Sequence, residues 1–179
     1  GRPTFDATLR GLEILKRHGV RFNTLTVVGS HNAHAPLEVY RFLKSIGSEV
    51  MQFIPLVENT GGVATPASVS GEAWGEFMVT IFDEWVRHDV GRHFIQHFDA
   101  ALSIWLGRGS PLCLFAPECG RVPALEANGD VFACDHFVSP EWKLGNLLDA
   151  PLADLVDSTQ QRNFGAAKAQ LPQQCQRCE

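Results

Sequence analysis

The sequence has no long apolar run and no excess of positive charge. No stretch approaches the roughly 20 consecutive apolar residues that a membrane-spanning helix needs, so we expect no membrane partner. Lysine and arginine together number 15, against 20 aspartates and glutamates, and the basic residues form no dense run. The resulting net charge of −5 predicts that nucleic acid is not a partner either.

The opening residues, GRPTFDATLRG, lack the basic-then-apolar pattern of a secretory signal. We therefore expect a cytoplasmic protein, although an internal piece of a longer protein would show no signal in any case. In that reducing compartment, cysteines are more often metal ligands or catalysts than disulfide partners. The 179 residues, 45% of them hydrophobic and 20% charged, suffice for one compact domain or for one domain with a small appendage.

The first part of the chain alternates between helical and strand patterns. A helix predicted over residues 4–18 precedes a strand rich in β-branched residues at 22–28. A second helix is predicted to begin at Pro36 and to end before Gly47, and a nearly continuous apolar strand follows at 50–57. Two strands joined by a helix predict a βαβ unit, with a parallel sheet that is buried on both faces.

This predicted sheet has too few strands to stand alone. No strand precedes the first helix, and two parallel strands do not make a stable sheet. We therefore expect the chain to lack its front part. Beyond a connection rich in Gly, Pro, Ser and Thr at 58–72, two amphipathic helices are expected, with a short strand at 93–96 leading into the second. We expect their aromatic residues to lie in the core, namely Trp74, Phe77, Trp85, Phe98 and Trp105.

The last part of the chain is rich in turns and cysteines. Periodic patterns become short from residue 110, so we place a domain boundary near 108–112. The pair in CQRC has the two-residue spacing with which both sulfurs bind one metal or cluster. All five cysteines follow the boundary: Cys113, Cys119, Cys134, Cys175 and Cys178.

A predicted β-hairpin connects two of these cysteines, in the segment CGRVPALEANGDVFACDHF. If the Asn-Gly dipeptide at 128–129 forms a two-residue type I′ turn, Pro123 lies opposite Cys134. The preceding segment, which carries Cys119 and then Cys113, is short enough to curl back toward the open end of the hairpin. Three thiols are therefore expected to gather there.

Thiol chemistry alone leaves several alternatives open. An iron–sulfur cluster and a structural zinc site both take four thiolates, so composition does not distinguish between them. Cys113 taken by itself also fits a small buried hydrophobe. For Asp135, which directly follows Cys134, the alternatives are a solvated turn, a helix cap and a functional carboxylate.

Several segments carry a resemblance to a known family. The spacing of Cys119, Gly129 and Cys134 resembles the opening of the SPASM motif, found in many radical S-adenosylmethionine enzymes. In order along nearly the whole chain, further segments resemble the anaerobic sulfatase-maturating enzymes. These segments are FNTLTVV, PLEVYRFLKSIGS, MQFIPLVE, IFDEWVRHDVGRHFIQHFDAAL, LCLFAPECG, CDHFVSPEWKLGN and QRNFG.

The family's Cys-x3-Cys-x2-Cys motif, which holds the cluster that cleaves S-adenosylmethionine, is missing from the sequence, and the second SPASM part stops after Cys178. Truncation at both ends would account for these departures. The resemblance implies an α/β fold. Residues 1–109 would form the C-terminal part of a partial (β/α)6 radical SAM barrel with linking helices. Residues 110–179 would form a small, truncated SPASM domain with a β-hairpin.

The resemblance also implies an activity for the intact parent, the oxidation of a sulfatase cysteine or serine to Cα-formylglycine. S-adenosyl-L-methionine would yield a 5′-deoxyadenosyl radical, which removes a hydrogen from the substrate β-carbon. Two auxiliary 4Fe–4S clusters would accept the remaining electron. The partners would be the sulfatase polypeptide, with a Cys/Ser-x-Pro/Ala-x-Arg type motif, and an electron donor such as flavodoxin or ferredoxin. The 179 residues alone are expected to be inactive.

The resemblance assigns a role to each candidate residue. Asp135 would be the catalytic base, ionised at neutral pH because the reference pKa of Asp is about 3.9. Adjacent strand residues point in opposite directions, so the Cys134 side chain would face a cluster while Asp135 faces the substrate. Gln52 and Phe53 would contact the adenine of S-adenosylmethionine. One cluster would be held by Cys113, Cys119 and Cys134, and a second, incomplete one by Cys175 and Cys178.

Two other functions remain open at this point. The chain could belong to a SPASM enzyme that modifies a different peptide. It could also be a zinc-stabilised binding module without chemistry of its own.

Overall fold

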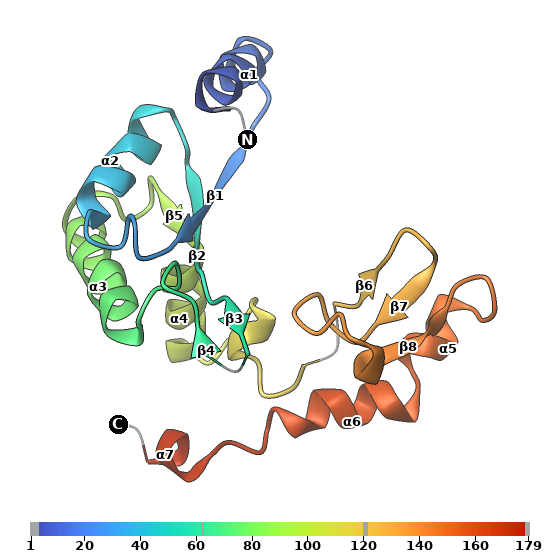
Figure 1. Cartoon of the computed structure of the whole chain (residues 1–179). Helices are drawn as coiled ribbons and strands as arrows, with labels where there is room; N and C mark the ends of the chain where they lie inside the picture. Colours follow the sequence, from blue (N-terminus) through green and yellow to red (C-terminus); the bar gives the residue numbers. More distant parts are fainter. Residues whose placement is uncertain (1–3, 62, 120–121, 178–179) are drawn as a thin grey trace. The chain divides into compact units, whose positions relative to one another are not determined.

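A computed structural model describes residues 4–61, 63–119 and 122–177, and its contacts divide the chain into two compact units, Gly1–Leu102 and Ser103–Glu179 (Figure 1). The first unit contains long helices and a parallel sheet. Its elements are α1 (Phe5–Arg17), β1 (Asn23–Val28), α2 (Pro36–Ser45), β2 (Val50–Pro55), β3 (Asn59–Thr60), β4 (Val63–Ala64), α3 (Gly71–His88), β5 (Phe94–Ile95) and α4 (Gln96–Trp105), the last of which crosses the boundary.

The predicted βαβ unit is confirmed. β1 and β2 pair in parallel from Asn23↔Val50 to Val28↔Pro55, with α2 as the connection between them. β5 adds a third parallel strand beside β2, giving the order β1-β2-β5. The strand predicted to lead into the second amphipathic helix is therefore also confirmed.

One face of this sheet is covered by α2 and α3, which lie on the same side of it (Figure 1). Met51 and Phe53 of β2 point into this core, and the ring of Phe53 packs edge-on against Phe77 of α3 at 5.4 Å. The other face was expected to be buried as well, and that prediction is wrong for this chain. Leu25 and Val27 of β1 are 60% and 44% exposed, because the described helices of the unit pack on the opposite side.

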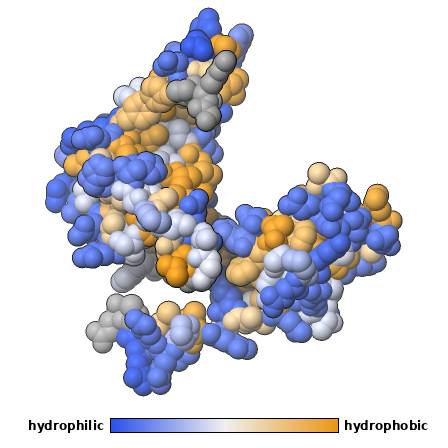
Figure 2. All heavy atoms as spheres, viewed as in Figure 1, coloured by the Kyte–Doolittle hydropathy of each residue, from blue (hydrophilic) through white to orange (hydrophobic). Residues whose placement is uncertain are grey.

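The predicted aromatic core is confirmed for α3 and for the start of α4. Phe77 is fully buried, Trp85 is 6% exposed, and Phe98 packs against Trp85 at 5.3 Å. Trp105 was predicted to be buried but is 89% exposed, because it lies two turns beyond the part of α4 that contacts the α3 aromatics. Apolar side chains also remain visible over α1 and β1 (Figure 2), where α1 buries none of its residues.

A polar network is buried inside the first unit. Asp89, only 7% exposed, accepts hydrogen bonds from Tyr40 Oη at 2.8 Å and from Lys44 Nζ at 2.7 Å. Burial alone would raise the pKa of Asp89, but the hydrogen bonds from Lys44 and Tyr40 outweigh it and lower the pKa. Burial and the Asp89 carboxylate together raise the pKa of Tyr40. The network joins α2 to the end of α3 through a carboxylate that accepts two hydrogen bonds at Oδ2.

The second unit is made of short elements around a three-stranded antiparallel sheet, in the order β6-β7-β8. Among the residues that the structure describes, no helix in either unit has both the length and the apolarity to cross a bilayer. The elements of the second unit are η1 (Cys113–Phe115), β6 (Ala124–Leu125), β7 (Asp130–Phe132), η2 (Pro140–Trp142), β8 (Lys143–Asn146), α5 (Leu152–Val156), α6 (Thr159–Ala167) and α7 (Gln173–Gln176).

The predicted hairpin is present, but its predicted turn and register are wrong. β6 and β7 pair through Leu125↔Val131, and Glu126 N donates to Asp130 O, so the loop has three residues rather than two. A type I′ turn needs a positive φ at both central residues, whereas only Gly129 adopts one (φ 89°). The Asn128 side chain accepts from Asp130 N and donates to its carboxylate, which holds the longer loop.

Candidate functional site

Three potential ligands lie together just beyond the end of β7. The Cys134 thiol donates to Asp135 Oδ1 at 3.2 Å, and His136 Nδ1 lies 2.9 Å from the same oxygen. Among the described residues, these three form a group with ligand atoms within 4.8 Å of one another. We expected Cys134 and Asp135 to point in opposite directions, and that was wrong. β7 ends at Phe132, and a turn closed by Phe137 N donating to Cys134 O brings the two side chains together.

The pKa values of the Cys134 thiol and the Asp135 carboxyl group shift in opposite directions. Burial, and then the neighbouring Asp135, raise the pKa of the Cys134 thiol, although a hydrogen bond from the His136 backbone opposes this. The thiol hydrogen bond and the nearby His136 lower the pKa of Asp135, against a smaller effect of desolvation. The Asp135 side chain is 63% exposed. Asp135 is thus an ionised carboxylate, open to solvent, next to a buried thiol.

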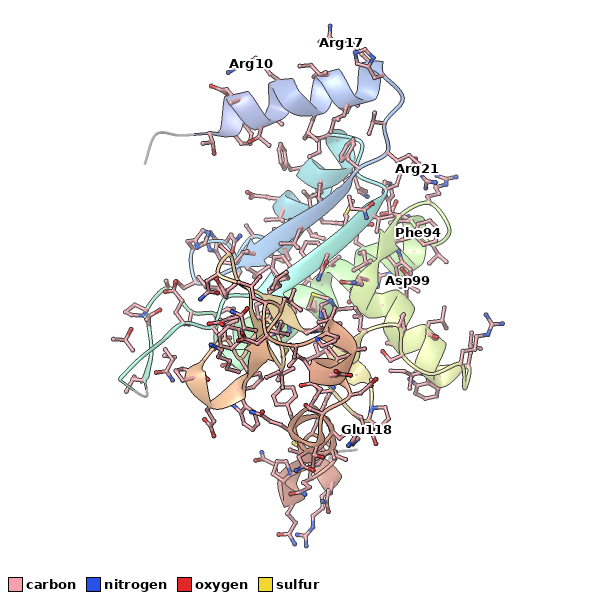
Figure 3. The ribbon with its side chains drawn as sticks, turned by 90° about the vertical axis from the view of Figure 1, so that its right-hand side faces the viewer. Arg10, Arg17, Arg21, Phe94, Asp99 and Glu118 are labelled. Atoms are coloured by element: carbon pink, nitrogen blue, oxygen red, sulfur yellow. The ribbon has the colours of Figure 1, made fainter. Side chains whose placement is uncertain are left out.

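Cys119 lies near Cys134 and is less buried than it. It packs against an apolar cluster formed by Ala133, Cys134 and Phe164, and it also lines an open cleft of about 660 Å³. Glu118, labelled in Figure 3, lines the same cleft. The cleft leaves open space beside the Cys119 thiol, while the apolar cluster still shields the Cys134 thiol.

The remaining predicted ligands differ in how the structure places them. Cys113 is exposed in η1, and Cys175 is exposed in α7, whereas Cys178 lies outside the described residues. In the described part of the chain, the thiols of Cys113, Cys119 and Cys134 do not form a group in which all three lie within 4.8 Å of one another. A cubane cluster holds its thiolates at separate corners, so it accepts a wider spacing than one ion does.

The donor set fits an iron–sulfur group. Thiols are soft ligands that suit iron–sulfur clusters and zinc rather than magnesium or calcium. The apolar side chains of Phe164, Trp142 and Leu144 pack around the Cys134 site. Such a shell limits solvent access, which is one of the factors that set a cluster's reduction potential.

The two candidate cofactor contacts on β2 point to opposite faces of the sheet. Phe53 has no exposed surface and packs on Phe77, so its side chain is directed into the core and its backbone is closed to solvent as well. Gln52 is half-buried and lies beside Leu25 on the uncovered face. Figure 3 shows this side of β1 and β2, together with Phe94 and Asp99.

Sequence reasoning missed two residues of α6 that contact the cysteine segments. Cys119 N donates to Gly165 O at 3.1 Å, and Gln161 Nε2 donates to Ala133 O at 3.0 Å. The available signal was a glycine in the interior of a helix, which costs stability and usually has a packing reason. The partner of that glycine could not be inferred from the sequence.

Comparison with known proteins finds homologous enzymes. Residues 119–179 match SPASM, an iron–sulfur cluster-binding domain. A serine-type anaerobic sulfatase-maturating enzyme of Bacteroides thetaiotaomicron is 43% identical over 196 residues, which cover 100% of this chain and 47% of the relative. The chain is a homologue of the anaerobic sulfatase-maturating enzymes. The family expected from the sequence is thus confirmed.

Further anaerobic sulfatase-maturating enzymes match over similar lengths. A cysteine-type enzyme of Clostridium perfringens is 30% identical over 186 residues, covering 100% of this chain and 50% of the relative. The solved structure of native anSMEcpe with bound AdoMet and Cp18Cys peptide superposes with a TM-score of 0.86 at 28% identity, covering 98% of this chain and 50% of that chain. The chain therefore spans about half the length of the relatives that it matches, and it shares their mixed α/β fold.

Proposed function

We propose that this chain is part of a radical SAM enzyme that oxidises a sulfatase serine or cysteine to Cα-formylglycine. Residues 1–109 would supply the C-terminal part of a partial (β/α)6 barrel, and 110–179 would supply the SPASM domain. The observation that carries the proposal is the pair formed by Asp135 and Cys134 inside the matched SPASM region. It joins an accessible, ionised carboxylate to a shielded thiol across 3.2 Å.

Asp135 fits the role of the base. When a serine becomes formylglycine, its β-carbon loses one hydrogen atom, its hydroxyl loses a proton, and one electron leaves. S-adenosyl-L-methionine, when bound, would supply the group that takes the hydrogen atom. Asp135 would take the proton, since a carboxylate is ionised at neutral pH and this side chain is open to solvent.

Cys134 fits the role of a ligand next to that base. Cys113 and Cys119 would complete this chain's share of one auxiliary 4Fe–4S cluster, while Cys175 and Cys178 would belong to a second. These clusters, when bound, would accept the electron that the substrate loses. A base and a ligand in adjacent positions would let the proton and the electron leave the substrate on the same side.

Gln52 is the better of the two proposed contacts for S-adenosyl-L-methionine. Its side chain lies on the uncovered face of the sheet, in the middle of β2, and ligands of parallel-strand barrels bind at the carboxyl ends of such strands. Phe53, the other expected contact, has no exposed surface in this chain, which counts against a contact through its side chain or its backbone.

We propose serine as the residue that is oxidised. The serine-type relative from Bacteroides shares 43% identity with this chain, whereas the cysteine-type relative from Clostridium shares 30%. The partners would be a sulfatase polypeptide with a Ser-x-Pro/Ala-x-Arg type motif and an electron donor such as flavodoxin or ferredoxin. Solved relatives with bound peptide support a polypeptide substrate.

The test uses the full-length protein after anaerobic reconstitution with iron and sulfide. Aldehyde formation is measured by mass spectrometry on matched serine and cysteine peptides, together with cleavage of S-adenosylmethionine. We expect Asp135→Asn to lose aldehyde formation while still cleaving S-adenosylmethionine. Asp149→Asn, which changes an exposed turn carboxylate in the same unit, is the control and should retain activity.

Three results would count against the proposal. Normal turnover by Asp135→Asn would remove this carboxylate from the mechanism. Aldehyde formation on neither peptide would favour a SPASM enzyme with a different substrate. A colourless protein with stoichiometric zinc would favour a binding module.

A further inference from the structure

One helix contacts all three cysteine-bearing segments of the proposed first cluster. α6 carries Gln161, Phe164 and Gly165, and Lys168 caps its C-terminal end. Their partners come from segments up to 55 residues away in the sequence. We call these four residues the α6 frame.

Gly165 holds the segment that carries Cys119. The Gly165 carbonyl accepts from Cys119 N at 3.1 Å, so the two backbones are in direct contact. A Cβ atom at residue 165 would lie 2.5 Å from Cys119 O, which is too close for any side chain. Only glycine allows this approach, and the backbone of Cys119 cannot move aside as a flexible side chain would.

Gln161 and Phe164 hold the segment that carries Cys134. Gln161 is 3% exposed and donates from Nε2 to Ala133 O at 3.0 Å, which fixes the peptide group directly before Cys134. The ring of Phe164 packs against Trp142 at 5.0 Å, within the apolar cluster that contains Cys134. This segment is therefore held to α6 by a hydrogen bond and by apolar packing.

Lys168 holds the third segment. Its Nζ donates to Cys113 O, across 55 residues of sequence. The contact also brings a positive charge to the backbone of a proposed ligand. Charge and hydrogen bonding around a cluster are among the factors that set its reduction potential, and positive charge favours the reduced, more negative form.

We propose that the α6 frame holds Cys113, Cys119 and Cys134 in their ligating arrangement before iron binds, and that Lys168 raises the reduction potential of the cluster they form. The first statement concerns the metal-free polypeptide. The second rests on the proposed function, because it requires the auxiliary cluster to be present.

The first test measures cross-linking of thiols in the iron-free, full-length protein. A short bifunctional thiol reagent is added, and the joined peptides are identified by mass spectrometry after proteolysis. We expect Cys119 and Cys134 to be joined in the wild type, and at least tenfold less often in Gly165→Ala. Gly75→Ala is the matched control, since a Cβ at this glycine in α3 meets nothing within 4 Å.

A second substitution guards against simple misfolding of Gly165→Ala. Gln161→Glu keeps the size of the side chain but removes the Nε2 donor to Ala133 O, and Gln160→Glu makes the same change at an exposed neighbour. We expect the Gln161 variant to lower cross-linking and the Gln160 variant to leave it unchanged. Wild-type cross-linking in both Gly165→Ala and Gln161→Glu would overturn the frame.

The second test measures the midpoint potential of the auxiliary clusters by redox titration followed by electron paramagnetic resonance. We expect Lys168→Gln to lower one midpoint potential and Lys168→Arg to restore it, with each potential measured on the iron-loaded fraction of the protein. An unaltered potential in Lys168→Gln would overturn the role of Lys168. A wild-type protein that binds no iron would instead refute the proposed function, while the cross-linking result would still decide the frame.

Discussion

The two units of this molecule are stabilised in different ways. The first has a continuous buried core that joins β1 and β2 to α2 and α3, with Tyr40, Phe53 and Phe77 fully buried. The second has strands of two to four residues and an apolar cluster whose buried members are Ala133, Cys134 and Phe164. Small cores rarely stabilise a domain by themselves, so domains of this kind rely on metals, cross-links and specific polar contacts. The candidate site lies in the unit with less apolar burial.

Phe77→Ala should give the largest difference in stability between the two units. Removing a fully buried phenylalanine should destabilise the first unit by about 3–5 kcal/mol, through lost burial and the cavity that remains. Hydrogen exchange followed by mass spectrometry measures each unit separately. Protection should fall in residues 4–102 and remain unchanged in the SPASM region. Equal loss in both would show that the two units unfold together.

Removing iron should give the opposite pattern. In the full-length protein, chelation should lower the protection of the SPASM region and leave that of β1, β2 and α3 unchanged, because the ligands of the proposed clusters all lie in the second unit. The same exchange measurement, made before and after chelation, tests this. A loss of protection centred on the first unit would contradict the assignment of the metal site.

A smaller effect is expected from Lys44→Met, which removes a donor to the buried Asp89 carboxylate. The loss should be about 1.5–3 kcal/mol, as for hydrogen bonds to charged groups. Asp89 has a lowered pKa in the folded state, so its contribution is present above the unfolded pKa of about 3.9 and is lost as the pH falls through the folded value. Urea unfolding between pH 7 and pH 3 should show the variant and the wild type converging at the acid end.

The turn of the hairpin offers a test of similar size in the other unit. Asn146 donates to Asn128 O at 3.0 Å and to Asp130 Oδ1 at 2.8 Å, and it accepts from Leu148 N at 2.8 Å. Asn146→Ala should destabilise the hairpin by about 1–3 kcal/mol, since it leaves part-buried polar groups without their partner. Exchange at residues 124–132 measures the effect. A change no larger than that of Asn128→Ala, which loses only local contacts, would show that the cross-strand bonds matter little.

The smallest effect is a gain in stability. Gly75→Ala lies inside α3 with free space around it, so it should stabilise the first unit by about 0.5–1 kcal/mol. Urea unfolding of the first unit measures it. Destabilisation would mean that the α3 surface at residue 75 is occupied in the full-length protein.

The sequence predicted the first unit better than the second. Its helices and strands are long enough for their periodicity to identify them, and β1, α2 and β2 all lie within a few residues of their expected bounds. The exceptions are residues whose burial depends on a neighbouring segment. Trp105 has the right helical spacing for a core residue, but the described part of the chain provides nothing to bury it.

The second unit depends on contacts that sequence patterns do not record. The Asn-Gly dipeptide favoured a two-residue turn, but the side chain of Asn128 selects a longer loop by bonding to Asp130. The adjacent Cys134 and Asp135 would diverge on a strand, but the strand ends before them. Gly165 and Cys119 are 46 residues apart in the numbering, and only the folded backbone shows that one must be glycine to accommodate the other.

The uncovered face of β1 has a practical consequence. In the described part of the chain β1 is the outer strand of its sheet, so one of its edges has no neighbouring strand and lies next to the exposed side chains of Leu25 and Val27. Such edges promote self-association between copies of a protein. A purified polypeptide limited to these residues should therefore elute at a larger apparent size as its concentration rises, and Leu25→Lys should suppress that behaviour.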